Sequence, residues 1–216
     1  MVEKHGDDPG RPRRTERIPT QPVKPRVTER IRISEPSSSI GRMGMWLFLA
    51  ALAVLFGATL VGYLVIRSRA PEWPPPGSPA LPAGLWISTA LLVLQSVLLA
   101  VGERSIRTGR VAGGARMLGA GMLVGVAFLG AQAANWMRLA SDNVLPEQSL
   151  LIWGFYVLSF LHAAHVLAGV VPMVLITLRA RRGRYTATNY EGVHLVGMYS
   201  HFLLATWVVI MAVLSF

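Results

Sequence analysis

The sequence contains five long apolar stretches, and together they occupy most of the chain after residue 42. They cover residues 43–66, 83–102, 117–137, 150–178 and 192–216. A helix needs about 20 consecutive apolar residues to cross the hydrocarbon core of a membrane, and each stretch is long enough. We therefore predict an all-α fold, a polytopic membrane bundle of five transmembrane helices. No room remains for a soluble catalytic domain.

The distribution of charge predicts how this bundle is oriented. The chain has a formal net charge of +10 and no cysteine, which excludes disulfides, thiolate metal sites and cysteine nucleophiles. Eighteen of the 21 lysines and arginines lie in residues 4–42, between the second and third stretches, or between the fourth and fifth. By the positive-inside rule, the N-terminus is then cytoplasmic and the C-terminus lies outside. Because the basic excess serves as an orientation signal, we expect no nucleic-acid binding.

Residues 1–40 form a polar tail that is distinct from the membrane domain of residues 41–216. The tail is rich in Arg, Pro, Glu and Ser and shows no apolar periodicity. Such a segment cannot bury enough apolar surface to offset its ordering entropy, so we predict that this basic tail is disordered. It is not a signal peptide, because polar residues precede the first apolar stretch. A docking arm for a neighbouring subunit is the alternative interpretation.

The polar side chains within the apolar stretches are the candidate functional residues. Those that we interpret as interhelical polar contacts are Gln132, Asn135, His162, His165, His194, Tyr199 and His201. No Asp, Glu, Lys or Arg lies deep inside a stretch, and Glu103 and Glu191 are near cytoplasmic ends. Transporters and pumps usually place ionisable groups at mid-membrane. The sequence therefore disfavours that class of protein.

His162 and His165 lie three residues apart, so they share one face of the predicted helix. An imidazole inside a membrane normally faces protein, a cavity or a cofactor. The favoured interpretation is that each ring donates a hydrogen bond to a neighbouring helix. A haem held between His162 and His201 on the antiparallel last stretch is the alternative. A metal site is not expected, because no carboxylate or thiolate stands nearby.

Two further features predict how the helices pack. Gly121 and Gly125 form a small-xxx-small pair, which lets another helix approach closely. Pro172 interrupts the fourth stretch and is expected to kink it.

Five ordered segments carry a family resemblance. The first two are Gly44-Met-Trp-Leu-Phe-Leu-Ala50 and residues 85–99 with the basic turn that follows them. The third is Gln132-Ala-Ala-Asn-Trp136, and the fourth runs from Phe155 to Gly169 and contains the His-x-x-His pair. The fifth combines Gly192-Val-His194, Tyr199-Ser-His201-Phe202 and Trp207. Together they resemble subunit III of the haem-copper oxidases, in its short five-helix form, over residues 41–216.

This resemblance implies an accessory, non-catalytic subunit of a terminal respiratory oxidase in a bacterial inner membrane. It implies no haem, copper or other cofactor in this chain, with haem and copper held by the partner subunits. It also implies packing on the catalytic subunit I and on subunit II, bound phospholipid, and support of proton uptake and stable turnover. A subunit-III-like component of a nitric oxide reductase and an independent b-type cytochrome are the alternatives. Cytochrome c and quinol both remain open as the electron donor.

The chain departs from the family pattern at four positions where the family usually has a carboxylate. They are Leu52, Asn135, His194 and Leu204. In addition, Ser200 stands where the family has a tryptophan. Roles that depend on those carboxylates are therefore not carried over to this chain. Helix packing and lipid binding do not depend on them. The departures indicate a divergent relative.

Overall fold

The computed structural model describes residue 1 and residues 38–75 and 82–215. Its elements are α1 (Ser38–Ser68), α2 (Gly84–Arg107), α3 (Val111–Ser141), the 3₁₀ turn η1 (Pro146–Gln148), α4 (Leu150–Arg181) and α5 (Glu191–Ser215). Five of these are long and apolar enough to cross a membrane, and the described residues contain no strand. This confirms the prediction of an all-α, multi-pass membrane protein. The predicted tail, residues 1–40, lies almost wholly outside the described residues.

The helices extend beyond the apolar stretches from which they were predicted. α2 continues to Arg107 rather than ending at residue 102, and α3 begins at Val111 rather than at 117. α4 ends at Arg181, three residues later than predicted. Apolarity marks only the part of a helix that lies in lipid. Arginine is a good helix former, so the helix continues into the polar flank.

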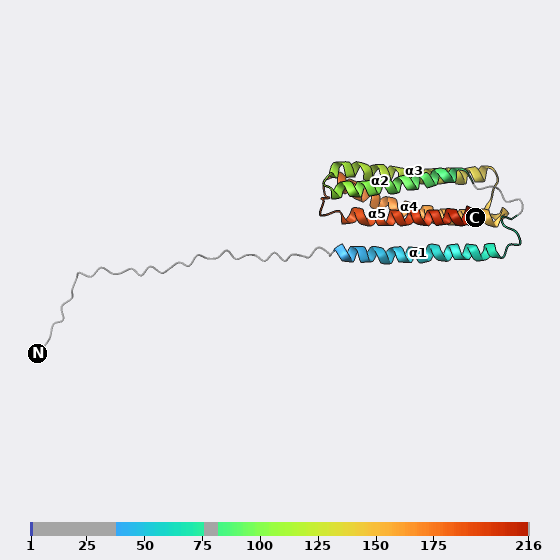
Figure 1. Cartoon of the computed structure of the whole chain (residues 1–216), viewed down its shortest axis with the longest axis horizontal. Coiled ribbons are helices and arrows are strands. Elements are labelled where there is room, and N and C mark those ends of the chain that lie inside the picture. Colours follow the sequence, from blue (N-terminus) through green and yellow to red (C-terminus); the bar gives the residue numbers. More distant parts are fainter. Residues whose placement is uncertain (2–37, 76–81, 216) are drawn as a thin grey trace. The chain divides into compact units, whose positions relative to one another are not determined.

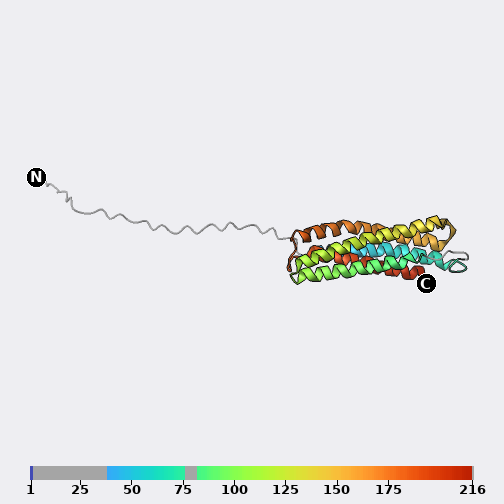
Figure 2. The same ribbon diagram turned by 90° about the horizontal axis from the view of Figure 1, so that it is seen from above.

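Helices α2 to α5 form a four-helix arrangement with α1 on its outside (Figure 1). α2 packs on α3 and α5, and α4 packs on the other side of both. α1 contacts only α4 and α5 among the described elements. The five helices run side by side along one axis, as the second view also shows (Figure 2). α4 and α5 are therefore the two helices that join α1 to the rest of the described bundle.

A narrow stripe of side chains attaches α1 to the rest. The buried residues Leu49, Leu52, Phe56 and Tyr63 recur at helical spacing along it. Its remaining surface is apolar and exposed, as shown by Trp46 at 64% and Val54 at 72%. Exposed apolar surface of this extent is a liability in water and is expected in contact with lipid.

Three helices end in the same backbone motif. At the end of α2, Gly109 has a φ of 82° and the N–H of Arg110 donates to the carbonyl of Ser105. Gly183 plays the same part after α4, with a φ of 66°. Asn143 does so after α3, with a φ of 55°. This is the Schellman pattern, in which a residue in the left-handed region stops the helix and satisfies its last carbonyls.

The predicted small-residue contact forms between α2 and α3. A Cβ at Gly121 would lie 3.2 Å from Leu99 of α2, and one at Gly125 would lie 2.6 Å from the side chain of Gln95. The two glycines thus let α2 approach α3 closely, as their spacing predicts. α4 continues as one helix through Pro172.

Candidate functional site

His162 occupies the place where α4 meets three other helices. Its side chain is fully buried, with 0% exposure. The ring centroid lies 5.0 Å from that of Trp207 on α5, 5.8 Å from Phe128 on α3 and 6.2 Å from Phe56 on α1. Neither ring nitrogen has a hydrogen-bond partner among the described residues. His162 thus joins the helices by aromatic packing, and the expected hydrogen bond to a neighbouring helix is not formed within the described structure.

His165 also differs from the expected interhelical donor. Its Nδ1 lies 2.7 Å from the carbonyl oxygen of Leu161, one turn earlier in the same helix. The interhelical bond at this position uses the backbone instead, because the hydroxyl of Tyr199 on α5 donates to the carbonyl of His165 at 2.7 Å. Gly169 makes room for this ring, since a Cβ there would lie 2.7 Å from Tyr199 Cε1. Tyr199 therefore joins α5 to α4 through this hydrogen bond.

A buried amide–hydroxyl cluster links α2 to α3. The hydroxyl of Ser88 donates to Gln132 Oε1 at 3.1 Å, and Asn135 Nδ2 donates to Ser88 Oγ at 3.3 Å. Gln132 and Ser88 have 0% exposure and Asn135 has 4%. Gly84 lies directly against Asn135, where no side chain would fit. Gln132 and Asn135 of α3 thus both contact Ser88 of α2.

Two tryptophan side chains form further hydrogen bonds between helices. Trp207 Nε1 on α5 donates to the hydroxyl of Thr89 on α2 at 2.9 Å. Trp136 Nε1 on α3 donates to the hydroxyl of Ser159 on α4 at 3.1 Å. Each pair of neighbouring helices in the four-helix arrangement is therefore joined by at least one side chain with a polar end. Such bonds inside a membrane contribute about 0.6 kcal/mol each on average.

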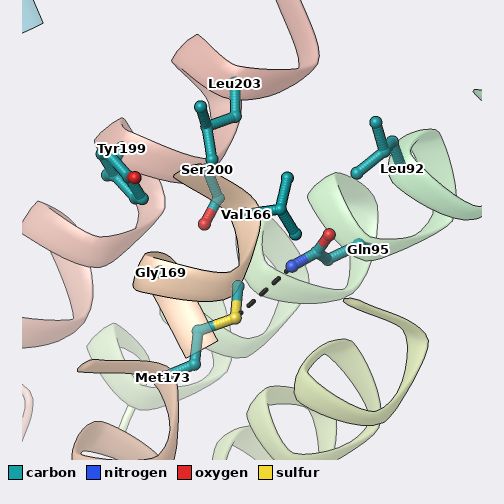
Figure 3. Close-up of a pocket in the computed structure, with 8 residues that line it drawn as sticks. All are labelled: Leu92, Gln95, Val166, Gly169, Met173, Tyr199, Ser200 and Leu203. Atoms are coloured by element: carbon teal, nitrogen blue, oxygen red, sulfur yellow. Dashed lines mark hydrogen bonds between the residues drawn. The ribbon is translucent and has the colours of Figure 1, made fainter. Parts of the chain in front are cut away.

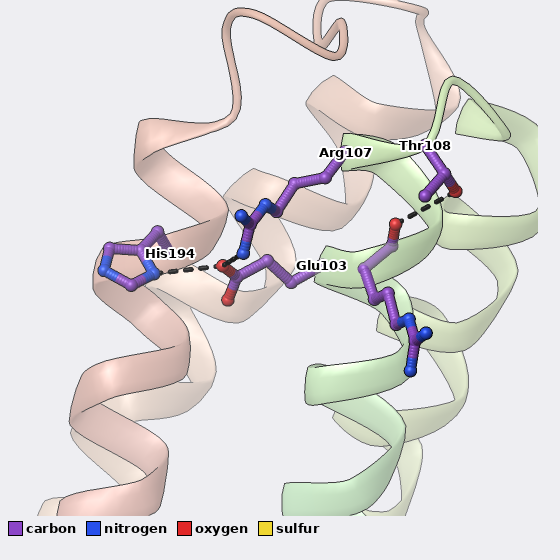
Figure 4. Close-up of polar contacts among 5 residues, drawn as sticks. Glu103, Arg107, Thr108 and His194 are labelled. Carbon is purple, nitrogen blue, oxygen red and sulfur yellow. Dashed lines mark hydrogen bonds and ion pairs between the residues drawn. The ribbon is translucent and has the colours of Figure 1, made fainter.

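The other two histidines of the described residues, His194 and His201, lie on α5 and face α2. His194 Nδ1 is 3.0 Å from Glu103 Oε1, and Arg107 reaches the same carboxylate at 3.9 Å (Figure 4). His201 bonds to the hydroxyl of Ser96. Glu103 is only 14% exposed in its side chain. At His194, where the resemblance expects an acid on the last helix, the acidic partner is instead supplied by α2.

The geometry separates His162 from His201. His162 is level with Trp207, which follows His201 by six residues on α5, or about 9 Å along the axis. His162 points into the aromatic cluster, whereas His201 points to Ser96 on α2. A haem bound at His162 would have to displace Phe128 or Trp207. The arrangement therefore does not support the bis-histidine haem that the sequence left open.

The centre of the four-helix arrangement offers little space for a small molecule, whereas a larger hollow of about 220 Å³ lies between α1 and α4. A cavity of about 10 Å³ lies among α2, α4 and α5, beside the contact between Gln95 Nε2 and the sulfur of Met173 at 3.4 Å (Figure 3). That volume holds about one water molecule. Among the described residues, no three His, Asp or Glu side chains are grouped so as to hold a metal ion. The described interior is packed mainly with apolar side chains, and polar contacts join the helices within it.

Sequence reasoning missed most of the partners in these contacts. Ser88, Thr89 and Ser96 are small hydroxyl residues in the apolar stretch of α2, and each bonds to another helix. The position of Glu103 near a helix end does not reveal its partner His194 on α5. A signal was available, because a serine or threonine inside a membrane helix needs a partner and these three lie within nine residues of α2.

Comparison with known proteins places this arrangement in a family. No protein-family model matches the chain. However, the chain is 31% identical to cytochrome c oxidase subunit 3 of Synechocystis sp. (strain ATCC 27184 / PCC 6803 / Kazusa) over 169 residues, which is 77% of this chain and 71% of that protein. The chain belongs to the cytochrome c oxidase subunit 3 family. The family resemblance predicted from the ordered motifs is thereby confirmed.

Other members of the subunit 3 family match over most of their length. Cytochrome c oxidase subunit 3 of Thermostichus vulcanus is 27% identical over 80% of this chain and 85% of that protein. Quinol oxidase subunit 3 of Bacillus subtilis (strain 168) is 25% identical over 82% of this chain and 88% of that protein. These identities show a divergent member of the subunit 3 family, with relatives named for both kinds of electron donor.

Proposed function

We propose that this chain is the accessory, non-catalytic subunit III of a haem-copper terminal oxidase. The observation that carries the proposal is the 31% identity to a cytochrome c oxidase subunit 3 over 71% of that protein's length. Haem and copper reside in the partner subunits I and II, and this chain contributes packing, bound phospholipid and stable turnover. The interior supports this role, because its histidines are engaged in helix packing and ion pairing.

The proposed location is a bacterial inner membrane with the N-terminus in the cytoplasm. The start of α1 and the start of α5 lie at the same end of the bundle, since Arg42 pairs with Glu191 at 3.1 Å. Eight further arginines lie in the α2–α3 and α4–α5 connections and in the helix ends beside them: Arg104, Arg107, Arg110, Arg116, Arg179, Arg181, Arg182 and Arg184. The positive-inside rule assigns such an end to the cytoplasm.

Gentle purification of the full chain tests the assembly. The chain is tagged at its own locus, extracted in several mild detergents and purified, with an equally tagged unrelated polytopic protein as the control. We expect a large haem-containing subunit to co-purify with this chain and not with the control. Mass spectrometry of that subunit separates an oxidase from a nitric oxide reductase.

Two outcomes would contradict the proposal. Recovery of the intact chain without any haem protein in every detergent would remove the oxidase assignment. A Soret band from the chain expressed alone with added haem would indicate an independent cytochrome instead.

A further inference from the structure

A groove opens on the protein surface where α3 begins and α4 ends. It has a volume of about 560 Å³ and is lined by Val111, Ala112, Ala115 and Arg116 of α3 together with Ala180 and Arg181 of α4. Ala115 and Ala180 are buried, at 4% and 2% exposure, and form its floor. The small side chains leave room for a ligand between the two helix ends.

Two guanidinium groups, one from each helix, border this groove. Arg116 and Arg181 are both exposed. Arg181 extends across to α3, because a Cβ at Gly119 would lie 3.1 Å from its Nη2. Neither arginine forms an ion pair with a described residue. The described carboxylates at this end, Glu103 and Glu191, are already paired with other residues.

The two helix ends beside the groove carry partial charges of opposite sign, positive at the start of α3 and negative at the end of α4. α3 begins at Val111, and no side chain caps its first N–H groups. Its first turn also contains no acidic residue. Uncapped N–H groups at a helix start carry a partial positive charge and favour an anion nearby. Because these two partial charges oppose each other, the positive potential of the groove comes mainly from the two guanidinium groups, neither of which is paired with a described residue.

Apolar surface continues from the groove along the membrane-spanning parts of α3 and α4. Leu123 follows Arg116 by seven residues on the same face of α3 and is 64% exposed. Leu178 precedes Arg181 by three residues on α4 and is 44% exposed. A ligand here would meet positive charge at one end and apolar side chains at the other. That combination fits an amphiphile and not a free ion.

We propose that this groove binds the phosphate headgroup of an anionic phospholipid between Arg116 and Arg181, with the acyl chains along α3 and α4. Basic pockets between transmembrane helices on the cytoplasmic side bind such headgroups. The inference rests on the phospholipid-holding part of the proposed function and gives it a location and a headgroup charge. It does not depend on which large subunit accompanies the chain.

Lipid retention by the full-length chain tests the site. The chain is reconstituted into nanodiscs of equal phosphatidylglycerol and phosphatidylcholine with identical acyl chains, re-extracted in mild detergent, and its retained lipid is counted by native mass spectrometry. We expect the wild type to retain phosphatidylglycerol preferentially. The double variant R116Q/R181Q should lose that preference by about tenfold, since each arginine near the surface contributes to anionic-lipid binding. The matched control R179Q/R184Q removes two arginines at the same end and should keep it.

Each result supports or contradicts the binding of an anionic phospholipid in the groove. Equal retention of both lipids by the wild type overturns the proposal even if a variant fails to fold. An equal loss in R179Q/R184Q shows a general charge effect and also overturns it. Displacement of the lipid by excess inorganic phosphate would indicate an ion site instead of a lipid site. Co-purification of the oxidase is measured separately, so a failed lipid site and a failed oxidase assignment are distinguishable.

Discussion

The imidazole ring of His162 and the indole ring of Trp207 lie 5.0 Å apart, with 40° between their planes. Both side chains have 0% exposure. His162 belongs to α4 and Trp207 to α5, and Trp207 also bonds to Thr89 of α2. This contact therefore lies at the centre of the four-helix arrangement. Its stability comes from the packing of rings, since the His162 nitrogens have no partner among the described residues.

Truncation of the His162 side chain should therefore lower the free energy of unfolding more than its replacement by an apolar side chain of similar volume. His162→Ala removes a ring that contacts Phe56, Phe128 and Trp207, and the cavity should lower the free energy of unfolding by about 3 kcal/mol. His162→Leu keeps most of the volume and should cost less than about 1.5 kcal/mol. Denaturant unfolding in detergent, followed by circular dichroism, measures both. If the leucine variant were as unstable as the alanine variant, the ring nitrogens would have an essential partner.

The number and type of the helices followed from the sequence because lipid imposes a length on apolar segments. The family also followed, since its motifs recur in order along the helices. The helix ends did not, because apolarity marks the lipid-embedded part and the backbone continues to a stop signal such as Gly109 or Gly183.

The contacts of the two clustered histidines could not be predicted. His-x-x-His spacing places both rings near one face of α4, but it does not say what lies opposite. Here α1 and the aromatic cluster lie opposite, so His162 packs against rings and His165 bonds to its own helix. Amides in a membrane interior need polar partners, and for Gln132 and Asn135 the α2 helix supplies Ser88.

A methyl group at Gly154 should disturb the attachment of α1. Its Cβ would lie 2.2 Å from Cε2 of the buried Tyr63 on α1, so Gly154→Ala forces the ring or the helix to move. We expect a loss of about 1–3 kcal/mol in the free energy of unfolding. Gly130→Ala is the matched control, because nothing lies within 4 Å of its Cβ. A melting temperature for Gly154→Ala equal to that of Gly130→Ala would show that α1 is not held by this contact.

The Glu103–His194 pair should show a measurable coupling between α2 and α5. Its side chains are 14% and 35% exposed, so water weakens the interaction without abolishing it. A double-mutant cycle of Glu103→Gln and His194→Gln should give a coupling free energy of about 0.5–1 kcal/mol. Unfolding in detergent at low ionic strength supplies the four stabilities. Strictly additive effects of the two substitutions would mean that the pair does not form in the membrane-embedded protein.

Removal of the Ser88 hydroxyl should weaken the contact between α2 and α3 at two bonds together. Ser88→Ala removes the 3.1 Å donor to Gln132 Oε1 and the 3.3 Å acceptor of Asn135 Nδ2, and leaves only the 3.5 Å contact between these two amides, in surroundings with almost no solvent exposure. The expected cost is about 1–2 kcal/mol of unfolding free energy, near the upper end for polar contacts between membrane helices. Ser105→Ala, on the same helix near its polar end, is the control and should change stability by less than about 0.5 kcal/mol. Thermal melting of both variants in one detergent makes the comparison. Equal melting temperatures for Ser88→Ala and the wild type would show that the two amides find other partners and that the cluster does not hold these helices together.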